Sequence, residues 1–345
     1  MGNEIRGSPE KWRKIVAAVR SEAVVPQRVA IVGAGAVGLY YGGRLLEAGH
    51  DVSFLARRDL ADLQKDGLTI ESVDGDCKFA SVAAFGSPAE LRAASSGDMD
   101  WVIVSLKSYS LPAVPDLLTP LVGPSTRILA IMNGLGIEET LAQTFPADKI
   151  FGGMAFTCNN RVDGVVKHLR YGALLVGHNG DEATELAEVE KLFEHSNVRL
   201  STAPCLLESR WEKLCWNVPF NGLACAMGGI TTDKIVGDAD LRALALEMMR
   251  EVVETGKMDL AANSLEGTGA LGQPLIDRMF SLTDSMGPYR PSTMIDLVEG
   301  SPMEVEYIFS NPLQRAKELG GPCAHVESVV QMIRAQDRLR GLEGP

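Results

Sequence analysis

The chain has 345 residues, of which 46% are hydrophobic and 23% charged, an ordinary composition for a soluble globular protein of two domains. Its 33 basic and 45 acidic residues give a net charge of −12, which argues against binding to nucleic acid or to an anionic membrane surface. No apolar run reaches the roughly 18 residues of a membrane span.

The cysteines and histidines do not have the spacing of a metal site, and the N-terminal residues do not have the pattern of a signal peptide. None of the six cysteines forms a C-x-x-C pair, and the five histidines have no ligand spacing. Free thiols in a reducing compartment are the simplest interpretation. Residues 1–27 form an extension that mixes acidic and basic residues, with a short helix expected from Ser8 to about Arg20. We therefore expect a cytoplasmic protein without a bound metal, and no chemistry in the extension.

A glycine-rich turn follows the first predicted strand, Arg28–Val32. A helix of small residues comes next and leads to a second strand, Asp51–Leu55. In this strand–turn–helix–strand context, G-x-G-x-x-G indicates dinucleotide binding more strongly than the motif alone. The first glycine makes the tight turn, the second lets a pyrophosphate approach the backbone, and the third lets the helix pack closely on the strand. The helix N-terminus then faces the phosphates. The sequence predicts a dinucleotide site, with a plain βαβ crossover as the alternative, formed by Gly33, Ala34, Gly35, Ala36, Val37 and Gly38.

The end of the second strand indicates which dinucleotide binds. An NAD site usually has Asp or Glu there to hold the ribose 2′-hydroxyl. Here the chain reads Ala56-Arg57-Arg58, and the first acid is Asp59. A guanidinium can bind a 2′-phosphate through two hydrogen bonds, whereas a carboxylate would repel it. The pattern favours NADP(H), with two solvated arginines at the start of a helix as the alternative.

Strand patterns continue to about residue 203. Asp100–Leu106 and Arg127–Met132 have the continuous apolar sequence of fully buried strands. Three later runs look like antiparallel additions to the sheet rather than further βαβ units. These are Lys149–Thr157, Gly164–Arg170 and Ala173–Val176. The remaining strands are predicted at Leu68–Val73, Lys78–Ala84 and Val198–Ser201, and helices at Asp59–Lys65, Glu138–Phe145 and Asp181–His195.

Helical periodicity replaces strand patterns beyond about Pro204. A boundary near 202–206 therefore divides an α/β, Rossmann-like domain, residues 28–204, from an all-helical domain, residues 205–345. Ligands of open α/β sheets bind beyond the carboxyl ends of the strands. We expect the helical domain to close over that edge and form an interdomain cleft. Its helices are predicted at Glu208–Met227, Asp238–Leu260, Pro274–Met286 and Pro302–Leu319.

Polar residues occur at positions that should reach this cleft. Lys107 and Asn133 directly follow buried strands, although a surface lysine and an Asn-Gly turn are the plain alternatives. In the first helix of the second domain, Lys213, Asn217 and Asn221 recur every four residues and share one face. Such a face can bind a carboxylate and a carbonyl, and a partly buried lysine can donate a proton. A solvated polar stripe is the alternative, and Pro219 should kink the helix.

Five motifs, in order, resemble the ketopantoate reductase family, the 2-dehydropantoate 2-reductases. The order and spacing match from about residue 28 to residue 335. The resemblance implies NADPH-dependent reduction of 2-dehydropantoate to (R)-pantoate, in pantothenate and coenzyme A synthesis. The motifs are GAGAVG (33–38), SLK (105–107), MNGLG (132–136), RWEKLCWNVPFN (210–221) and RPSTMIDLVEGSPMEVEYI (290–308).

The resemblance also implies roles for single residues. Lys213 matches the general acid, and Glu304 matches a glutamate beside the substrate and the nicotinamide ribose. Asn217, Asn221 and Ser292 match substrate-binding residues. Lys107 and Asn133 match residues that line the nicotinamide side, where Asn133 also reaches substrate, and Arg57 matches the arginine near the 2′-phosphate. From the residues alone, Glu304 could instead form a capping box with Ser301, and Ser292 could be an N-cap.

The chain departs from the family pattern at two positions. Gly222 replaces a frequent proline, and Tyr289 replaces an asparagine that binds substrate in some members. The alternatives are therefore a paralogous reductase of another 2-keto acid, an opine-type or 3-hydroxy acid dehydrogenase, and a non-catalytic NADPH-binding sensor. The sequence leaves the oligomeric state open, with a homodimer as the assembly to test.

Overall fold

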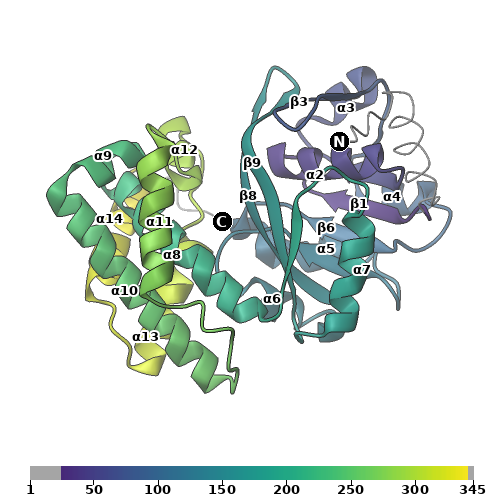
Figure 1. Ribbon diagram of the computed structural model, residues 1–345. Helices are drawn as coiled ribbons and strands as arrows, with labels where there is room; N and C mark the ends of the chain where they lie inside the picture. Colours follow the sequence, from purple (N-terminus) through teal and green to yellow (C-terminus); the bar gives the residue numbers. More distant parts are fainter. Residues whose placement is uncertain (1–24, 341–345) are drawn as a thin grey trace, which may run out of the picture.

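The computed structural model describes residues 25–340, so the helix predicted at Ser8–Arg20 lies outside the described residues. An α/β part is followed by a part made of helices (Figure 1). The last strand, β10, ends at Ala203, and the long helix α8 (Leu206–Ala226) begins the helical part. The predicted fold class is confirmed. Among the described residues, no helix is both long and apolar enough to cross a membrane.

The strands form one mixed sheet. They are β1 (Arg28–Val32), β2 (Asp51–Leu55), β3 (Leu68–Ser72), β4 (Cys77–Phe79), β5 (Ala83–Phe85), β6 (Trp101–Val104), β7 (Arg127–Ala130), β8 (Ile150–Val162), β9 (Val165–His178) and β10 (Leu200–Ala203). Their order is β4-β3-β9-β8-β7-β6-β1-β2-β5, with β10 beside β9. Strands β5, β2, β1, β6, β7 and β8 pair in parallel, which gives the sheet one carboxyl edge.

Two predictions about the strands were wrong. The run Lys78–Ala84 is not one strand, because β4 pairs with β3 at one end of the sheet and β5 pairs with β2 at the other. The runs on either side of Gly172 are one strand, β9, in which register shifts absorb a glycine at positive φ. Strand β8 is antiparallel to β9, as expected, but parallel to β7.

The sheet curls around helix α2 (Ala36–Glu47). Only three residues separate β4 from β5, so the two ends of the sheet lie within about 15 Å of each other. Helix α2 is buried along most of its length and contacts both end regions. A Cβ atom on Gly42 would lie 2.5 Å from Phe54 of β2, and one on Gly43 would lie 2.4 Å from Ile70 of β3. The small residues of α2 are therefore required by packing on two sides.

Helix α8 is the centre of the helical part and runs without a break through Pro219. It contacts α9, α10, α11, α12 and α14, and Trp211 and Phe220 are fully buried. The sequence did not predict α9, α12 or α14, and helical structure near residue 302 starts only at Val305. The bounds are α9 (Thr232–Gly237), α10 (Ala239–Ala262), α11 (Gln273–Met286), α12 (Ser292–Glu299), the π-turn η3 (Glu306–Ser310), α13 (Asn311–Leu319) and α14 (Ala324–Arg340).

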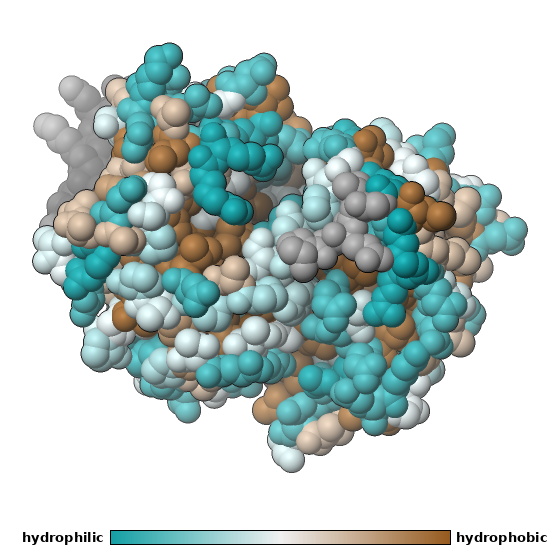
Figure 2. Space-filling model, turned by 180° about the vertical axis from the view of Figure 1, so that it is seen from behind, coloured by the Kyte–Doolittle hydropathy of each residue, from teal (hydrophilic) through white to brown (hydrophobic). Residues whose placement is uncertain are grey.

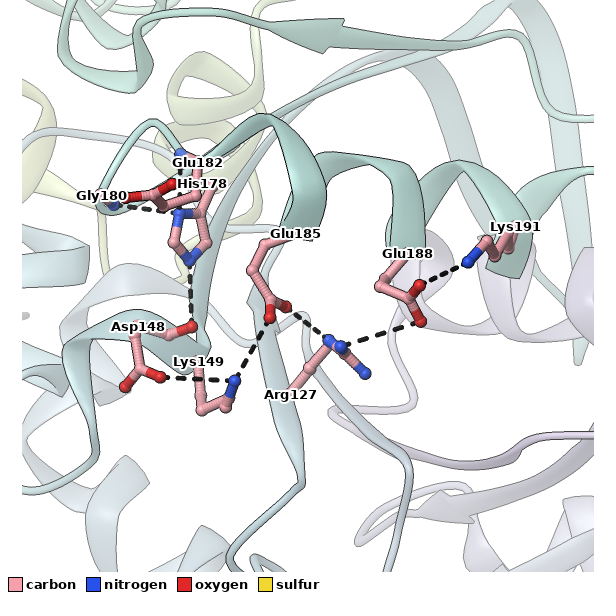
Figure 3. Close-up of polar contacts among 9 residues, drawn as sticks. All are labelled: Arg127, Asp148, Lys149, His178, Gly180, Glu182, Glu185, Glu188 and Lys191. Atoms are coloured by element: carbon pink, nitrogen blue, oxygen red, sulfur yellow. Dashed lines mark hydrogen bonds and ion pairs between the residues drawn. The ribbon is translucent and has the colours of Figure 1, made fainter.

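A polar network attaches helix α7 to the amino ends of β7 and β8 (Figure 3). Arg127 Nε lies 2.7 Å from Glu185 Oε2, and Lys149 Nζ lies 3.3 Å from the other oxygen of Glu185. These partly exposed pairs contribute at most about 1 kcal/mol each. Because they lie at the sheet edge opposite the glycine turn, we assign them a structural role. The other helices of this part are α3 (Leu60–Asp66), α4 (Pro88–Ala94), η1 (Ser108–Ala113), α5 (Val114–Leu118), α6 (Ile137–Leu141), η2 (Ala147–Lys149) and α7 (Ala183–Phe193).

The packing of α2 yields a stability prediction. We expect Gly42→Ala to destabilise the protein by about 1–3 kcal/mol, because the new methyl group overlaps the packed ring of Phe54. Gly237→Ala is the matched control, since a methyl group added to this helical glycine would have no atom within 4 Å, and the change should be neutral or stabilise by up to about 1 kcal/mol. Urea unfolding of both variants measures the difference. Equal unfolding midpoints would contradict the packing of α2 between two strands.

Candidate functional site

The glycine turn lies at the carboxyl end of β1. Gly33 has φ +108°, and a Cβ on it would lie 2.9 Å from Ser105. A Cβ on Gly38 would lie 2.1 Å from the Gly33 carbonyl oxygen, which also accepts a 2.7 Å hydrogen bond from Ser105 Oγ. A Cβ on Gly35, by contrast, would have no atom of residues 25–340 within 4 Å apart from its chain neighbours and the backbone of its own helix. The first and third glycines are therefore fixed by packing, while the space beside the second is open to a ligand.

The N-terminus of α2 has the properties of an anion site. Its N-cap residue, Gly35, provides no side-chain hydrogen bond, and its first turn, which starts with Ala36 and Val37, contains no acidic residue. The first N–H groups of the helix are therefore without a capping side chain and carry the positive end of the helix dipole. These features fit the pyrophosphate of a dinucleotide.

The arginines after β2 are exposed. Arg57 and Arg58 follow the buried Ala56, and neither forms an ion pair with another residue between 25 and 340. The next residue, Asp59, is paired with Arg161 of β8. Within this part of the chain, the two guanidinium groups are thus free for a ligand at the end of β2, as a site for a 2′-phosphate requires.

Lys107 is held by two carboxylates from the helical part. Its Nζ lies 2.6 Å from Asp296 Oδ2 and 3.5 Å from Glu304 Oε2. Burial alone would lower the pKa of Lys107, but the charges of Glu304 and Asp296 raise it above its usual value. Burial raises the pKa of Asp296 to about 6, against the opposing effect of Lys107. Lys107 is therefore held as a cation by two carboxylates, although its side chain is still 40% exposed.

Asp296 is a residue of this site that the sequence analysis missed. It lies on α12 four residues after Ser292, so the two side chains share a helix face. That spacing was visible in the sequence, but no local pattern indicated that the partner would be Lys107, 189 residues away.

Glu304 does not form a capping box with Ser301. Its side chain is only 2% exposed, and Oε1 accepts a 2.8 Å hydrogen bond from the backbone N–H of Ser108. Helical structure begins only after it, at Val305. The carboxylate therefore lies against the chain that follows β6, beside Lys107, and joins the two parts of the molecule.

Lys213 extends from α8 to strand β8. Its Nζ donates a 2.9 Å hydrogen bond to the carbonyl oxygen of Ala155 and lies 5.4 Å from the centre of the Phe156 ring. Burial and, to a smaller degree, the charge of Arg210 lower the pKa of Lys213 to about 7, while Glu304 acts in the opposite direction. This ammonium group can release a proton near neutral pH.

The two asparagines of α8 are buried, so the interpretation as a solvated stripe was wrong. Asn221 Oδ1 accepts hydrogen bonds from the N–H of Thr293, at 3.0 Å, and from Ser292 Oγ, at 3.5 Å. Ser292 is the first residue of α12 rather than its N-cap, which is Pro291. Asn221 Nδ2 is buried and has no partner among the described residues, which leaves one amide donor for a ligand.

The loop after β7 docks on the helical part. Gly134 has φ +111° and packs against Tyr307, and the N–H of Leu135 donates to the Tyr307 carbonyl at 2.8 Å. Asn133 is half-buried in this loop. Within residues 25–340, no side-chain hydrogen bond or ion pair joins Asn133, Asn217 or Arg57 to the Lys107–Asp296–Glu304 cluster. Viewed from behind, the surface is hollowed where the two parts meet, with hydrophobic residues in the hollow (Figure 2).

Comparison with known proteins identifies the family. The family model "Ketopantoate reductase PanE/ApbA" matches residues 29–181, and "Ketopantoate reductase PanE/ApbA C terminal" matches residues 206–337. The 2-dehydropantoate 2-reductase of Nostoc sp. is 33% identical over 318 residues, which cover 90% of this chain and 95% of that protein. This chain belongs to the ketopantoate reductase family.

Solved structures of ketopantoate reductases are also similar. The 2-dehydropantoate 2-reductase from Geobacter metallireducens GS-15 has a TM-score of 0.83 and 37% identity, and the match covers 89% of this chain and 99% of that chain. The enzyme from Methylococcus capsulatus has a TM-score of 0.80 and 27% identity, with 91% and 97% covered. This member of the family is an oxidoreductase that acts on a keto group, and the relatives' names support ketopantoate reduction. Two solved structures of D-mandelate dehydrogenase, which share the fold at 18% and 19% identity, are described with NADH.

Proposed function

We propose that this chain reduces 2-dehydropantoate to (R)-pantoate with NADPH, as a step of pantothenate and coenzyme A synthesis in the cytoplasm, and that Lys213 is the general acid. One observation carries the catalytic part of this proposal. The Lys213 ammonium is held by a carbonyl rather than a carboxylate, and burial lowers its pKa to about 7. A proton donor with such a pKa is matched to chemistry at neutral pH.

The cofactor's phosphates fit the glycine turn and the start of α2, where the space beside Gly35 is open. Arg57 is exposed and, among residues 25–340, unpaired at the end of β2, which favours NADPH over NADH through contact with the 2′-phosphate. The reduced nicotinamide supplies a hydride to the keto carbon. Lys107, held as a cation, and Glu304 line the nicotinamide side in this proposal, together with Asn133.

The substrate's polar groups fit the face of α8. Asn221 has a free amide donor among the described residues, and Ser292 is hydrogen-bonded to the same amide, so both can turn to a carboxylate or hydroxyl of the substrate. Asn217 lies one turn before Asn221 on that face. Lys213 donates its proton to the keto oxygen as the keto carbon accepts the hydride, and solvent then reprotonates the neutral amine. By donating this proton, Lys213 neutralises the negative charge that develops on the keto oxygen.

A second candidate is the reduction of another 2-keto acid. Tyr289 lies near Cys158 of β8, and burial raises its pKa to about 12. Its ring is 6.1 Å from that of Trp216 on α8. An aromatic side chain at this position favours an apolar substituent on the keto acid. A non-catalytic sensor would need no proton donor, so the Lys213 environment argues against it. A homodimer is the proposed assembly, since a similar structure from Staphylococcus aureus is described as a dimeric ketopantoate reductase.

Cofactor and substrate can be tested in one assay. We expect oxidation of NADPH with ketopantoate, at a kcat/KM at least tenfold above that with NADH, since a guanidinium–phosphate contact contributes about 1.5–3 kcal/mol. The measurement is the loss of absorbance of each cofactor with ketopantoate and a panel of other 2-keto acids. A faster reaction with another acid would favour the second candidate, and no oxidation with any acid would favour the sensor.

Removal of the proton donor should slow the chemical step. We expect Lys213→Ala to lower kcat by about 10²–10⁴-fold, because a positioned general acid contributes a factor of this size. The dissociation constant of NADPH should change little. Lys234→Ala, at a lysine that is 70% exposed, is the matched control and should keep full activity. Unchanged turnover of the Lys213 variant would exclude it from the role.

The rate of reduction should depend on pH through Lys213. Its pKa in the folded protein is about 7, and only the protonated form below that pH can donate. We therefore expect kcat/KM for reduction to be constant below about pH 7 and to fall about tenfold per pH unit above it. A pH profile of the wild type and of Lys213→Ala measures this limb, which the variant should lack. A wild-type profile that stays flat to alkaline pH would refute the assignment.

A further inference from the structure

The β8–β9 hairpin extends over the cofactor edge of the sheet. Strand β8 pairs with β7 only as far as Gly152, which is level with the last residues of β1, β6 and β7. Residues 153–162 continue beyond that edge, paired with β9 alone. Ligands of such sheets bind beyond the same edge. The projecting part of β8 is therefore a wall of the space in which we place the dinucleotide.

One face of this wall is polar. Side chains alternate along a strand, so Ala155, Thr157, Asn159 and Arg161 share a face. Ala155 packs against the core cluster that contains the residues of α2, so this face is turned to the side of the sheet where α2 lies. Among the described residues, Thr157 Oγ1, both polar atoms of the Asn159 side chain and Arg161 Nη1 are buried without a hydrogen-bond partner, and Arg161 Nη1 has only its ion-pair contact with Asp59. Buried polar atoms without a hydrogen-bond partner are rare in native proteins, so this face offers hydrogen bonds to a polar ligand.

Arg161, at the end of this row, is paired with Asp59. The side chain of Arg161 is only 15% exposed, and Asp59 directly follows Arg57 and Arg58. Asp59 is thus the acidic residue nearest in sequence to the proposed 2′-phosphate site. A free carboxylate there would repel a phosphate and could accept a hydrogen bond from a ribose 2′-hydroxyl, which is how NAD sites select NAD.

We propose that Arg161 is a specificity-determining residue, which neutralises Asp59 and thereby makes the site selective for NADPH. This inference rests on the proposed function. Three guanidinium groups and one carboxylate leave a net charge of about +2, which balances a phosphomonoester of charge about −1.5 to −2. Without Arg161 the site keeps Arg57 and Arg58 but exposes the Asp59 carboxylate to the phosphate. The hairpin therefore contributes to cofactor choice from 102 residues away in the sequence.

Binding of NADPH and NADH to four variants tests this inference. We expect Arg161→Gln to raise the dissociation constant for NADPH about tenfold, because the site loses one positive charge, and to leave that for NADH unchanged or lower. Asp59→Asn should increase the preference for NADPH about threefold, since Arg161 is then free to face the phosphate. The double variant should recover most of the wild-type preference. Lys167→Gln, which removes a charge of the same hairpin that is paired with Glu71, is the control and should change neither constant more than about twofold.

The outcomes separate this inference from the proposed function. Tryptophan fluorescence titrations give the constants, and melting curves with 2′,5′-ADP and ADP repeat the comparison on the adenosine half alone. If wild type prefers NADPH but Arg161→Gln keeps that preference, the inference fails and the proposed function stands. Equal weakening of NADPH and NADH by Arg161→Gln, or a double variant no better than the single one, also overturns it. If wild type does not prefer NADPH, both fail. If Arg161→Gln does not fold, the preference of Asp59→Asn for NADPH over NADH still decides the test.

Discussion

The hydrogen bond from Lys213 to the carbonyl oxygen of Ala155 is the contact on which the proposed chemistry depends. A carbonyl can orient an ammonium group but cannot neutralise it, so the cost of removing the charge from water remains and the pKa falls to about 7. Lys107 shows the opposite case, because two carboxylates compensate its burial and raise its pKa. The same type of side chain is thus the proposed proton donor at Lys213 and a cation stabilised by carboxylates at Lys107.

The position of Lys213 depends in turn on how α8 is attached to the α/β part. Arg210, one turn earlier, forms a buried ion pair with Glu138 and donates a 2.6 Å hydrogen bond to the carbonyl oxygen of Met132. Trp211 is held from the other side by Asp259. A buried ion pair is a weak source of net stability, but removal of one partner is costly, so such a pair resists any displacement of the helix. We infer that Arg210 fixes the register of α8 against β8 and also helps to lower the pKa of Lys213.

The features that sequence could predict are those set by neighbours in the chain. The turn at Gly33–Gly38, the strands around it and the helical face of Lys213 are local patterns, and the structure has the glycine turn, the parallel strands and α8 where they were expected. The partners of Lys107 could not be predicted in the same way, because Asp296 and Glu304 meet it only through tertiary contact. The capping-box pattern at Ser301 and Glu304 was misleading for this reason: a buried contact with Ser108 outweighs a local cap. The predicted strand Lys78–Ala84 is likewise divided between β4 and β5 because the sheet curls. No pattern within these seven residues indicates that division.

Strand β8 connects the two chemical tasks that we propose for the site. Its Ala155 carbonyl orients the proton donor, and six residues further on Arg161 pairs with the acid next to the 2′-phosphate arginines. In an extended strand these positions are about 20 Å apart. Strands β6 and β7 end before this region, so no other parallel strand of the described sheet could reach both positions. The sheet that carries β8 curls around α2, whose Gly42 and Gly43 leave no room for a Cβ atom against Phe54 of β2 and Ile70 of β3. Gly42 and Gly43, which lie outside the glycine turn, therefore help to shape the sheet that carries the proposed site.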